Sequence, residues 1–196
     1  MVSITCGKKA TRRCSEVVLK VTILGLDHET QWLDPTGDLR EMLKTLFAQS
    51  RPELVAEEAH KLPTTVAQRL ASAMDIAWLN VDMNDSEREL NGISANVRRS
   101  PVSTEDGSFK MCEFYNPVSD GLREQHWIDQ IKKASVASTV LICGALHLDP
   151  VAQKLRECGY EVDQVKVWEY CWYKTHRFDY AIKERDGDRW CEPILR

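Results

Sequence analysis

The sequence lacks long hydrophobic runs. No stretch of about 18 apolar residues occurs among its 196 residues, so it contains no candidate transmembrane helix. The first twenty residues also lack the apolar block that a signal peptide requires. We therefore expect a cytoplasmic protein with no membrane partner.

A strong charge of either sign is also missing. Charged residues make up 29% of the chain and the formal net charge is −4, which gives no general attraction to nucleic acid or anionic lipid. The basic stretch GKKATRR at 7–13 is short, and we interpret it as part of a solvated N-terminal tail, residues 1–16. We expect no nucleic-acid partner.

Cysteine pairs of the CxxC type are absent. The seven cysteines form an odd set without a framework spacing, and several lie inside apolar runs. This pattern indicates free thiols in a reducing compartment, with Cys143 as a small buried apolar residue.

Apolar and polar blocks alternate along most of the chain. A hydrophobic content of 43% is enough for the core of one domain, residues 1–196. We predict strands at 17–24, 53–59, 76–81, 138–144 and 160–167. Helices between them are predicted to begin near Asp38, Thr65, Asp120 and Asp149. This order indicates an α/β fold with a mostly parallel β-sheet flanked by helices.

Two segments do not follow this alternation. Residues 94–119 have no periodicity, and we interpret them as a loop or insertion that is either a functional lid or, as we favour, partly disordered. Residues 168–196 form an aromatic C-terminal extension, predicted to make an antiparallel hairpin at the sheet edge. Its tryptophans would close the core, which we favour, or form a contact surface, for example in a homo-oligomer.

Polar side chains follow the predicted strands directly. The strand ends carry Asp27, His28 and Glu29, then Glu57 and Glu58, then Asp82, and finally His147. In an open parallel sheet the ligand site lies outside the carboxyl ends of the strands. We therefore expect these residues to be neighbours in space.

Two of the strand ends share a Gly-x-x-His motif. LGLDH at 24–28 and CGALH at 143–147 each place a glycine after an apolar strand and a histidine three residues later. Two imidazoles and a carboxylate suit a divalent ion of the Zn, Mn or Co type, and a second carboxylate could serve as general base. Without a metal, the same groups could act as an acid–base pair around a polarised carbonyl.

Each of these residues also has a structural interpretation. Glu57 and Glu58 point to opposite faces of an extended strand, so only one of them should belong to the site. Asp82, followed by Asn84 and Asp85, is better interpreted as a helix start. Arg123 lies in the first turn of its helix, where a cation is unfavourable, so it forms either a surface salt bridge or an inward contact with the carboxylates.

Taken together, the motif residues resemble the TraB/PrgY, TIKI and GumN group, within the ChaN and erythromycin-esterase-like superfamily. The resemblance covers residues 17–167 and comprises the two Gly-x-x-His motifs, the segment Pro52 to Glu58, and the pair Arg123 and Trp127. It implies an α/β fold in which two histidines and a glutamate converge. For the TIKI branch it implies divalent-metal-dependent peptide hydrolysis.

The resemblance assigns roles to individual residues. His28, His147 and Glu58 match the motif positions of the group, and Arg123 matches its arginine. Glu57 takes the part of Glu58 if the strand register differs by one. The chain departs from the group in lacking a signal or anchor, in being shorter, and in the segment 94–119, which has no counterpart.

The leading hypothesis is a metal-dependent hydrolase acting on a small-molecule or peptide substrate. His28, His147 and Glu58 would hold the ion, Glu57 or Asp27 would handle the proton, and Arg123 would hold a carboxylate or developing oxyanion. The alternative is a non-catalytic protein that sequesters a small peptide, a nucleotide or haem. A third interpretation is an interaction protein that uses its aromatic C-terminus.

Overall fold

The computed structural model describes residues 18–59, 61–93, 99–103, 109–167, 170, 179–185 and 188–194. Side chains are described for 18–28, 30–59, 61–93, 115–167 and 170. The predicted N-terminal tail therefore lies outside the described residues, as do Trp168 and Trp172 of the C-terminal extension.

Five parallel strands form the main sheet, in the order β3-β2-β6-β1-β7. Their bounds are Lys20–Leu26 for β1, Leu54–Glu57 for β2, Ala77–Asn80 for β3, Ser138–Gly144 for β6 and Glu161–Lys166 for β7. The predicted α/β fold with a mostly parallel sheet is confirmed. The two Gly-x-x-His strands are neighbours, because β1 pairs with β6 and places Leu26 opposite Gly144.

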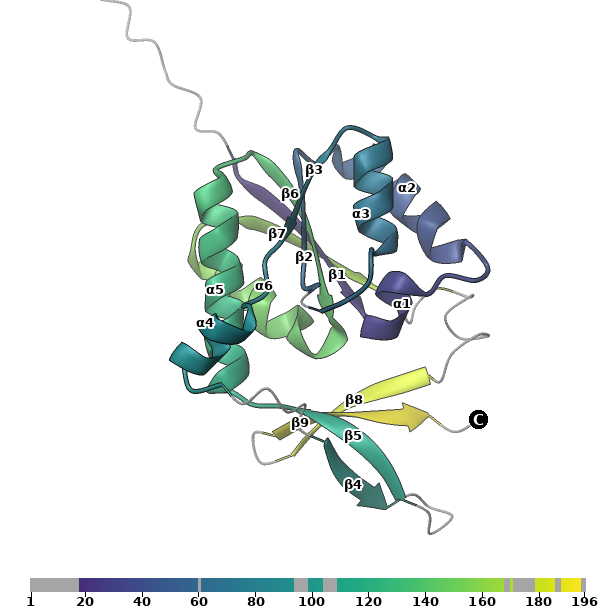
Figure 1. Ribbon diagram of the computed structural model, residues 1–196, viewed down its shortest axis with the longest axis vertical. Coiled ribbons are helices and arrows are strands. Elements are labelled where there is room, and N and C mark those ends of the chain that lie inside the picture. Colours follow the sequence, from purple (N-terminus) through teal and green to yellow (C-terminus); the bar gives the residue numbers. More distant parts are fainter. Residues whose placement is uncertain are drawn as a thin grey trace, which may run out of the picture.

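Helices cover both faces of this sheet (Figure 1). They are α1 His28–Trp32, α2 Asp38–Ser50, α3 Val66–Ala73, α4 Asp85–Leu90, α5 Ser119–Ala134, the 3₁₀ turn η1 Ala145–His147, and α6 Leu148–Glu157. Thr65 caps α3 as predicted, because its side chain accepts from the Gln68 amide. Helix α2 begins at Asp38 as predicted, but Asp34, not Asp38, accepts from the amides of its first turn.

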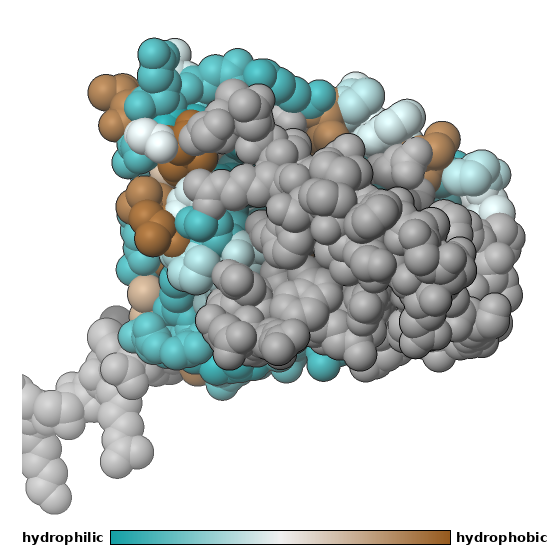
Figure 2. All heavy atoms as spheres, turned by 90° about the horizontal axis from the view of Figure 1, so that it is seen from below, coloured by the Kyte–Doolittle hydropathy of each residue, from teal (hydrophilic) through white to brown (hydrophobic). Residues whose placement is uncertain are grey.

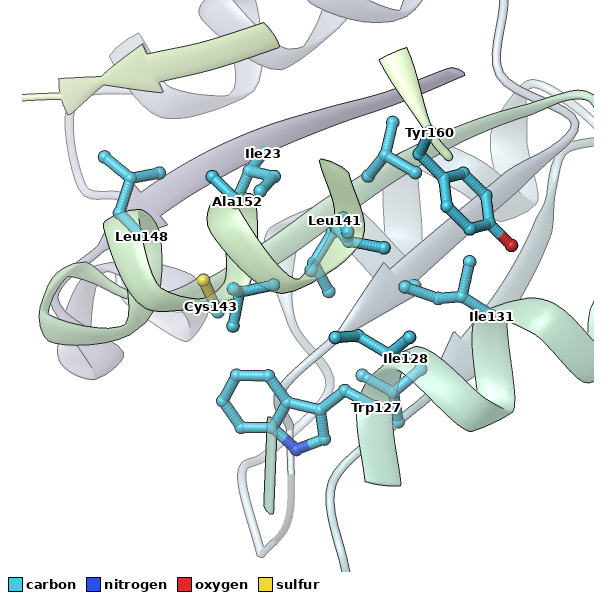
Figure 3. Packing of buried hydrophobic residues seen from close by; sticks show 14 of the residues in the cluster. Ile23, Trp127, Ile128, Ile131, Leu141, Cys143, Leu148, Ala152 and Tyr160 are labelled. Atoms are coloured by element: carbon cyan, nitrogen blue, oxygen red, sulfur yellow. The ribbon is translucent and has the colours of Figure 1, made fainter. Parts of the chain in front are cut away.

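Apolar side chains fill the space on each side of the sheet. Trp127 and Ile128 of α5 pack with Leu141 and Cys143 of β6 and with Leu148 of α6 on one face (Figure 3). A second cluster joins α2 and α3 to the opposite face. In the first cluster, Cys143 is completely buried as a small apolar residue, and burial raises the pKa of its thiol.

A second, antiparallel sheet lies next to the carboxyl ends of the parallel strands (Figure 1). It has the order β4-β5-β9-β8, with bounds Arg99–Ser103 for β4, Phe109–Tyr115 for β5, Asp179–Arg185 for β8 and Asp188–Ile194 for β9. The C-terminal hairpin therefore forms, but its predicted place at the edge of the parallel sheet is wrong, because β9 pairs with β5.

The interpretation of 94–119 as a loop is also wrong over its described part. Strands β4 and β5 pair as an antiparallel hairpin. Tyr115, the last residue of β5, brings this sheet to the carboxyl ends of the parallel strands, and β9 lies beside η1.

Figure 2 shows the molecule from below relative to Figure 1. On this face the described residues are mainly hydrophilic, and the apolar ones lie in separate groups. Among the described helices, none is long and apolar enough to cross a membrane.

Candidate functional site

Three strand ends bring His28, Glu58 and His147 together. His28 is the first residue of α1, two positions beyond the end of β1, and Glu58 directly follows β2. His147 ends the single turn η1 that follows β6. Since β6 lies between β1 and β2 in the sheet, the three side chains meet at one edge.

Glu58 is at the centre of this group. Its Oε2 accepts from the Gly144 amide at 2.8 Å, and its Oε1 accepts from Nη2 of Arg123. The same Oε1 lies 3.6 Å from Nε2 of His28 and 3.9 Å from Nε2 of His147. Burial raises the pKa of Glu58, but His28, Arg123 and His147 together lower it to about 2, so this buried group is a carboxylate.

The tautomer of His28 follows from its contact with Gln31. The amide nitrogen of Gln31 donates to the Glu58 carbonyl at 3.1 Å and to Oε1 of Glu57 at 3.2 Å. The remaining amide oxygen lies 2.7 Å from Nδ1 of His28 and can only accept a hydrogen bond. Nδ1 therefore carries a proton, and in the neutral ring the Nε2 lone pair of His28 faces Glu58.

His147 has the same arrangement. Its Nδ1 lies 2.8 Å from Oε1 of Glu124, a carboxylate oxygen, so Nδ1 donates, and in the neutral ring Nε2 has the lone pair. Trp127 and Tyr115 contact the ring edge to face, with centroids 4.9 and 5.8 Å away. These contacts fix the plane of the imidazole.

Arg123 points inward, which is the second of the two alternatives left open for it. Its Nε and Nη2 donate to Asp82 at 3.1 and 3.0 Å, and Nη2 also contacts Glu58. Burial lowers the pKa of Arg123, but the two carboxylates raise it above its usual value, so the guanidinium is charged. Arg123 holds Glu58 in place.

Glu57 lies outside this group. Its carboxyl accepts from Thr65 at 2.6 Å, from the Trp78 indole at 2.8 Å and from Gln31. Burial raises the pKa of Glu57, although these hydrogen bonds lower it. Three donors occupy its oxygens, so Glu57 joins β2 to α3 and β3. Asp27 is half-buried where β1 ends, and its assignment to proton transfer stays a prediction.

Two further carboxylates belong to this network: Asp82, which was expected among the strand-end residues, and Glu124, which was not assigned to the site from the sequence. Asp82 is buried and accepts from Arg88, Arg123 and Trp127. The cluster that it begins does mark a helix start, because Asn84 caps α4 and Asp85 is its first residue. Glu124 is completely buried against His147. A signal for Glu124 was available, since it is a carboxylate in the otherwise apolar stripe of α5.

The three side chains offer the nitrogen and oxygen donors that a divalent cation of the Zn, Mn or Co type takes. Two ligands of a tetrahedral zinc ion stand roughly 3.3 Å apart, because the bonds are about 2.0–2.1 Å long. The Glu58 distances of 3.6 and 3.9 Å are wider, and among the described residues no group of three or more His, Cys, Asp or Glu side chains stands close enough to hold a metal ion. The glycine at 144 leaves room, because a Cβ there would lie 3.1 Å from Nε2 of His28 and 3.4 Å from Oε2 of Glu58.

No family model, curated protein or solved structure matches this chain. The resemblance to the TraB/PrgY, TIKI and GumN group therefore stays a prediction from the motif residues.

Proposed function

We propose that the protein is a metal-dependent hydrolase of the TraB/TIKI type that acts on a peptide, amide or ester bond. One observation carries the proposal: His28 and His147 each commit Nδ1 to an acceptor and turn the Nε2 lone pair toward the same oxygen of Glu58. With both rings neutral, these two lone pairs and the carboxylate oxygen repel one another, although Arg123 also contacts that oxygen, and a divalent cation between them would relieve the repulsion. The orienting contacts from Gln31 and Glu124 are typical of metal-ligating histidines.

The charges around the site support the same conclusion. Arg123 is shared by Glu58, Asp82 and Asp120. Arg88 also forms an ion pair with Asp82, and Lys154 forms one with Glu124. With both histidines neutral, these ion pairs hold one more carboxylate than cation. A bound divalent ion would compensate that charge in a region where unpaired carboxylates are costly.

His28, His147 and Glu58 would hold the ion, which when bound lowers the pKa of a water molecule toward neutrality. Glu58 and His147 are almost inaccessible, with side chains 2% and 8% exposed, whereas His28 is 41% exposed. The substrate therefore approaches from the side of His28. Arg123 orients Glu58 and stays charged throughout.

The test is metal analysis of untagged protein beside His28→Ala and His147→Ala. His126→Ala is the control, because the His126 ring hydrogen-bonds Gln130 of the same helix. We expect one divalent ion per chain in the wild type and the control, and loss of that ion in both site variants. Ester and peptide hydrolysis should disappear with it. The proposal fails if the wild type binds no divalent ion, or if both site variants bind it as the wild type does.

The remaining outcomes separate the alternatives. Hydrolysis that survives chelation but requires both histidines would identify a metal-free acid–base pair. An ion bound without turnover of any ester or peptide would identify a sequestering protein. Haem binding would be seen as a Soret band that is lost in the two site variants.

A further inference from the structure

Glu124 is a carboxylate in the wrong place for packing. It shares the inner face of α5 with Trp127, Ile128 and Ile131, and its exposed fraction is 0%. An apolar residue would fill this position without the cost of removing a carboxylate from water. Its presence therefore needs another reason.

The contacts of Glu124 divide between its two oxygens. Oε1 lies 2.8 Å from Nδ1 of His147. Oε2 accepts from Nζ of Lys154 at 2.7 Å and from the hydroxyl of Tyr115 at 3.1 Å. Lys154 is itself held by the Gly121 carbonyl at 3.1 Å. Every neighbour of Glu124 in this network is thus able to donate, and each lies on a different element from the others.

We infer that Glu124 is a positioning residue that fixes His147 in the tautomer with the proton on Nδ1. Lys154 fixes the orientation of the side chain at position 124, because it requires an acceptor, and so determines which atom faces His147. The consequence of that tautomer, a lone pair on Nε2 toward Glu58, rests on the proposed function. The tautomer itself does not, because it follows from the donors and acceptors around Glu124 alone.

The substitution Glu124→Gln tests the inference because it replaces one carboxylate oxygen with an amide nitrogen and removes the charge, while it keeps the shape of the side chain. The ammonium of Lys154 has only donors, so it requires the amide oxygen of glutamine. The amide nitrogen must then face Nδ1 of His147, to which it can only donate. We expect the proton of His147 to move from Nδ1 to Nε2.

Removal of the lysine should reverse this effect. In Glu124→Gln with Lys154→Met, the hydroxyl of Tyr115 can either donate or accept, so the amide is free to turn. Its oxygen can then accept from Nδ1, and the original tautomer should return. Lys154→Met alone is the matched control, since the carboxylate is still present and the tautomer should not change.

The measurement is ¹⁵N NMR of the imidazole nitrogens in metal-free, histidine-labelled protein at about pH 8, with His147 assigned by its loss in His147→Ala. A wild-type ring protonated on Nε2, or on both nitrogens, overturns the inference even if no variant folds. An unchanged tautomer in folded Glu124→Gln also overturns it, as does an Nε2 proton that persists in the double variant.

The result is independent of the proposed function. If the wild type binds no metal but the tautomer exchanges as described, the positioning role stands and the hydrolase proposal fails. If the metal binds at His28 and His147 but the tautomer of His147 does not change in Glu124→Gln, the hydrolase proposal stands and the positioning role fails. Where both are correct, the affinity for the ion falls by about 10- to 100-fold in Glu124→Gln and recovers in the double variant.

Discussion

Arg123 donates to both carboxylate oxygens of Asp82, from Nε at 3.1 Å and from Nη2 at 3.0 Å, although the two residues are 41 positions apart. This two-point contact joins α5 to the segment that follows β3. The same guanidinium contacts Glu58, so one side chain compensates two carboxylates that are each 2% exposed.

We therefore predict that Arg123→Met lowers the free energy of unfolding by about 3–5 kcal/mol, because it leaves two buried carboxylates with too few partners. Arg123→Lys should recover only part of this loss, since an ammonium cannot donate in the same fork. Urea denaturation of both variants measures the effect. Arg40 is the control, because its side chain is 59% exposed, and Arg40→Met should change the free energy of unfolding by no more than about 0.5 kcal/mol. Equal losses in the two methionine variants would contradict this prediction.

Local patterns were sufficient to predict the parallel sheet. The apolar block at 17–24 became β1 at Lys20–Leu26, and the block at 138–144 became β6. The expected nearness of His28, Glu58 and His147 followed from the strand order that such alternation favours. A strand that is buried on both faces is a continuous run of apolar residues, so it can be recognised from the local sequence alone.

The second sheet and the network behind His147 could not be predicted in this way. Strand β5 pairs with β9 through Phe114 with Trp190 and Tyr115 with Arg189, contacts that no local periodicity encodes. The same holds for Glu124, because its polar partners come from η1, α6 and β5. A buried carboxylate is visible in the sequence only as an exception to an apolar stripe.

Glu58 should make the protein sensitive to acid. Its pKa is lowered from 4.5 to about 2 in the folded protein, so the stability that the carboxylate contributes is complete above about pH 4.5 and is lost as the pH falls toward 2. The loss is on the order of 3 kcal/mol. We expect the free energy of unfolding of the wild type, relative to Glu58→Gln, to decrease across this range in urea titrations. A difference that is constant with pH would contradict the prediction.

Glu57, the adjacent residue, should show the opposite slope. Burial raises its pKa above the usual 4.5, so the folded protein binds this proton more tightly than the unfolded chain does. The stability linked to that proton is complete below about pH 4.5 and is lost as the pH rises through the folded-state pKa. Relative to Glu57→Gln, the wild type should therefore become less stable with rising pH. The two glutamine variants, measured over one pH series, serve as controls for each other, and slopes of the same sign would exclude this description.

Gly144→Ala should separate the geometry of the site from the stability of the fold. The backbone at 144 has φ −57° and ψ 140°, which alanine adopts without strain, but the new Cβ would lie 3.1 Å from Nε2 of His28 and 3.4 Å from Oε2 of Glu58. The half-exposed His28 ring can move away, so we expect the unfolding free energy to change by less than about 1 kcal/mol. The displaced ring should weaken Zn²⁺ or Mn²⁺ binding by about 10-fold or more, measured by titration calorimetry. Gly121→Ala is the control: its Cβ would meet only Nζ of Lys154, at 3.5 Å, so ion binding should be unchanged. If Gly144→Ala binds the ion with wild-type affinity, the ion is held somewhere other than beside His28 and Glu58.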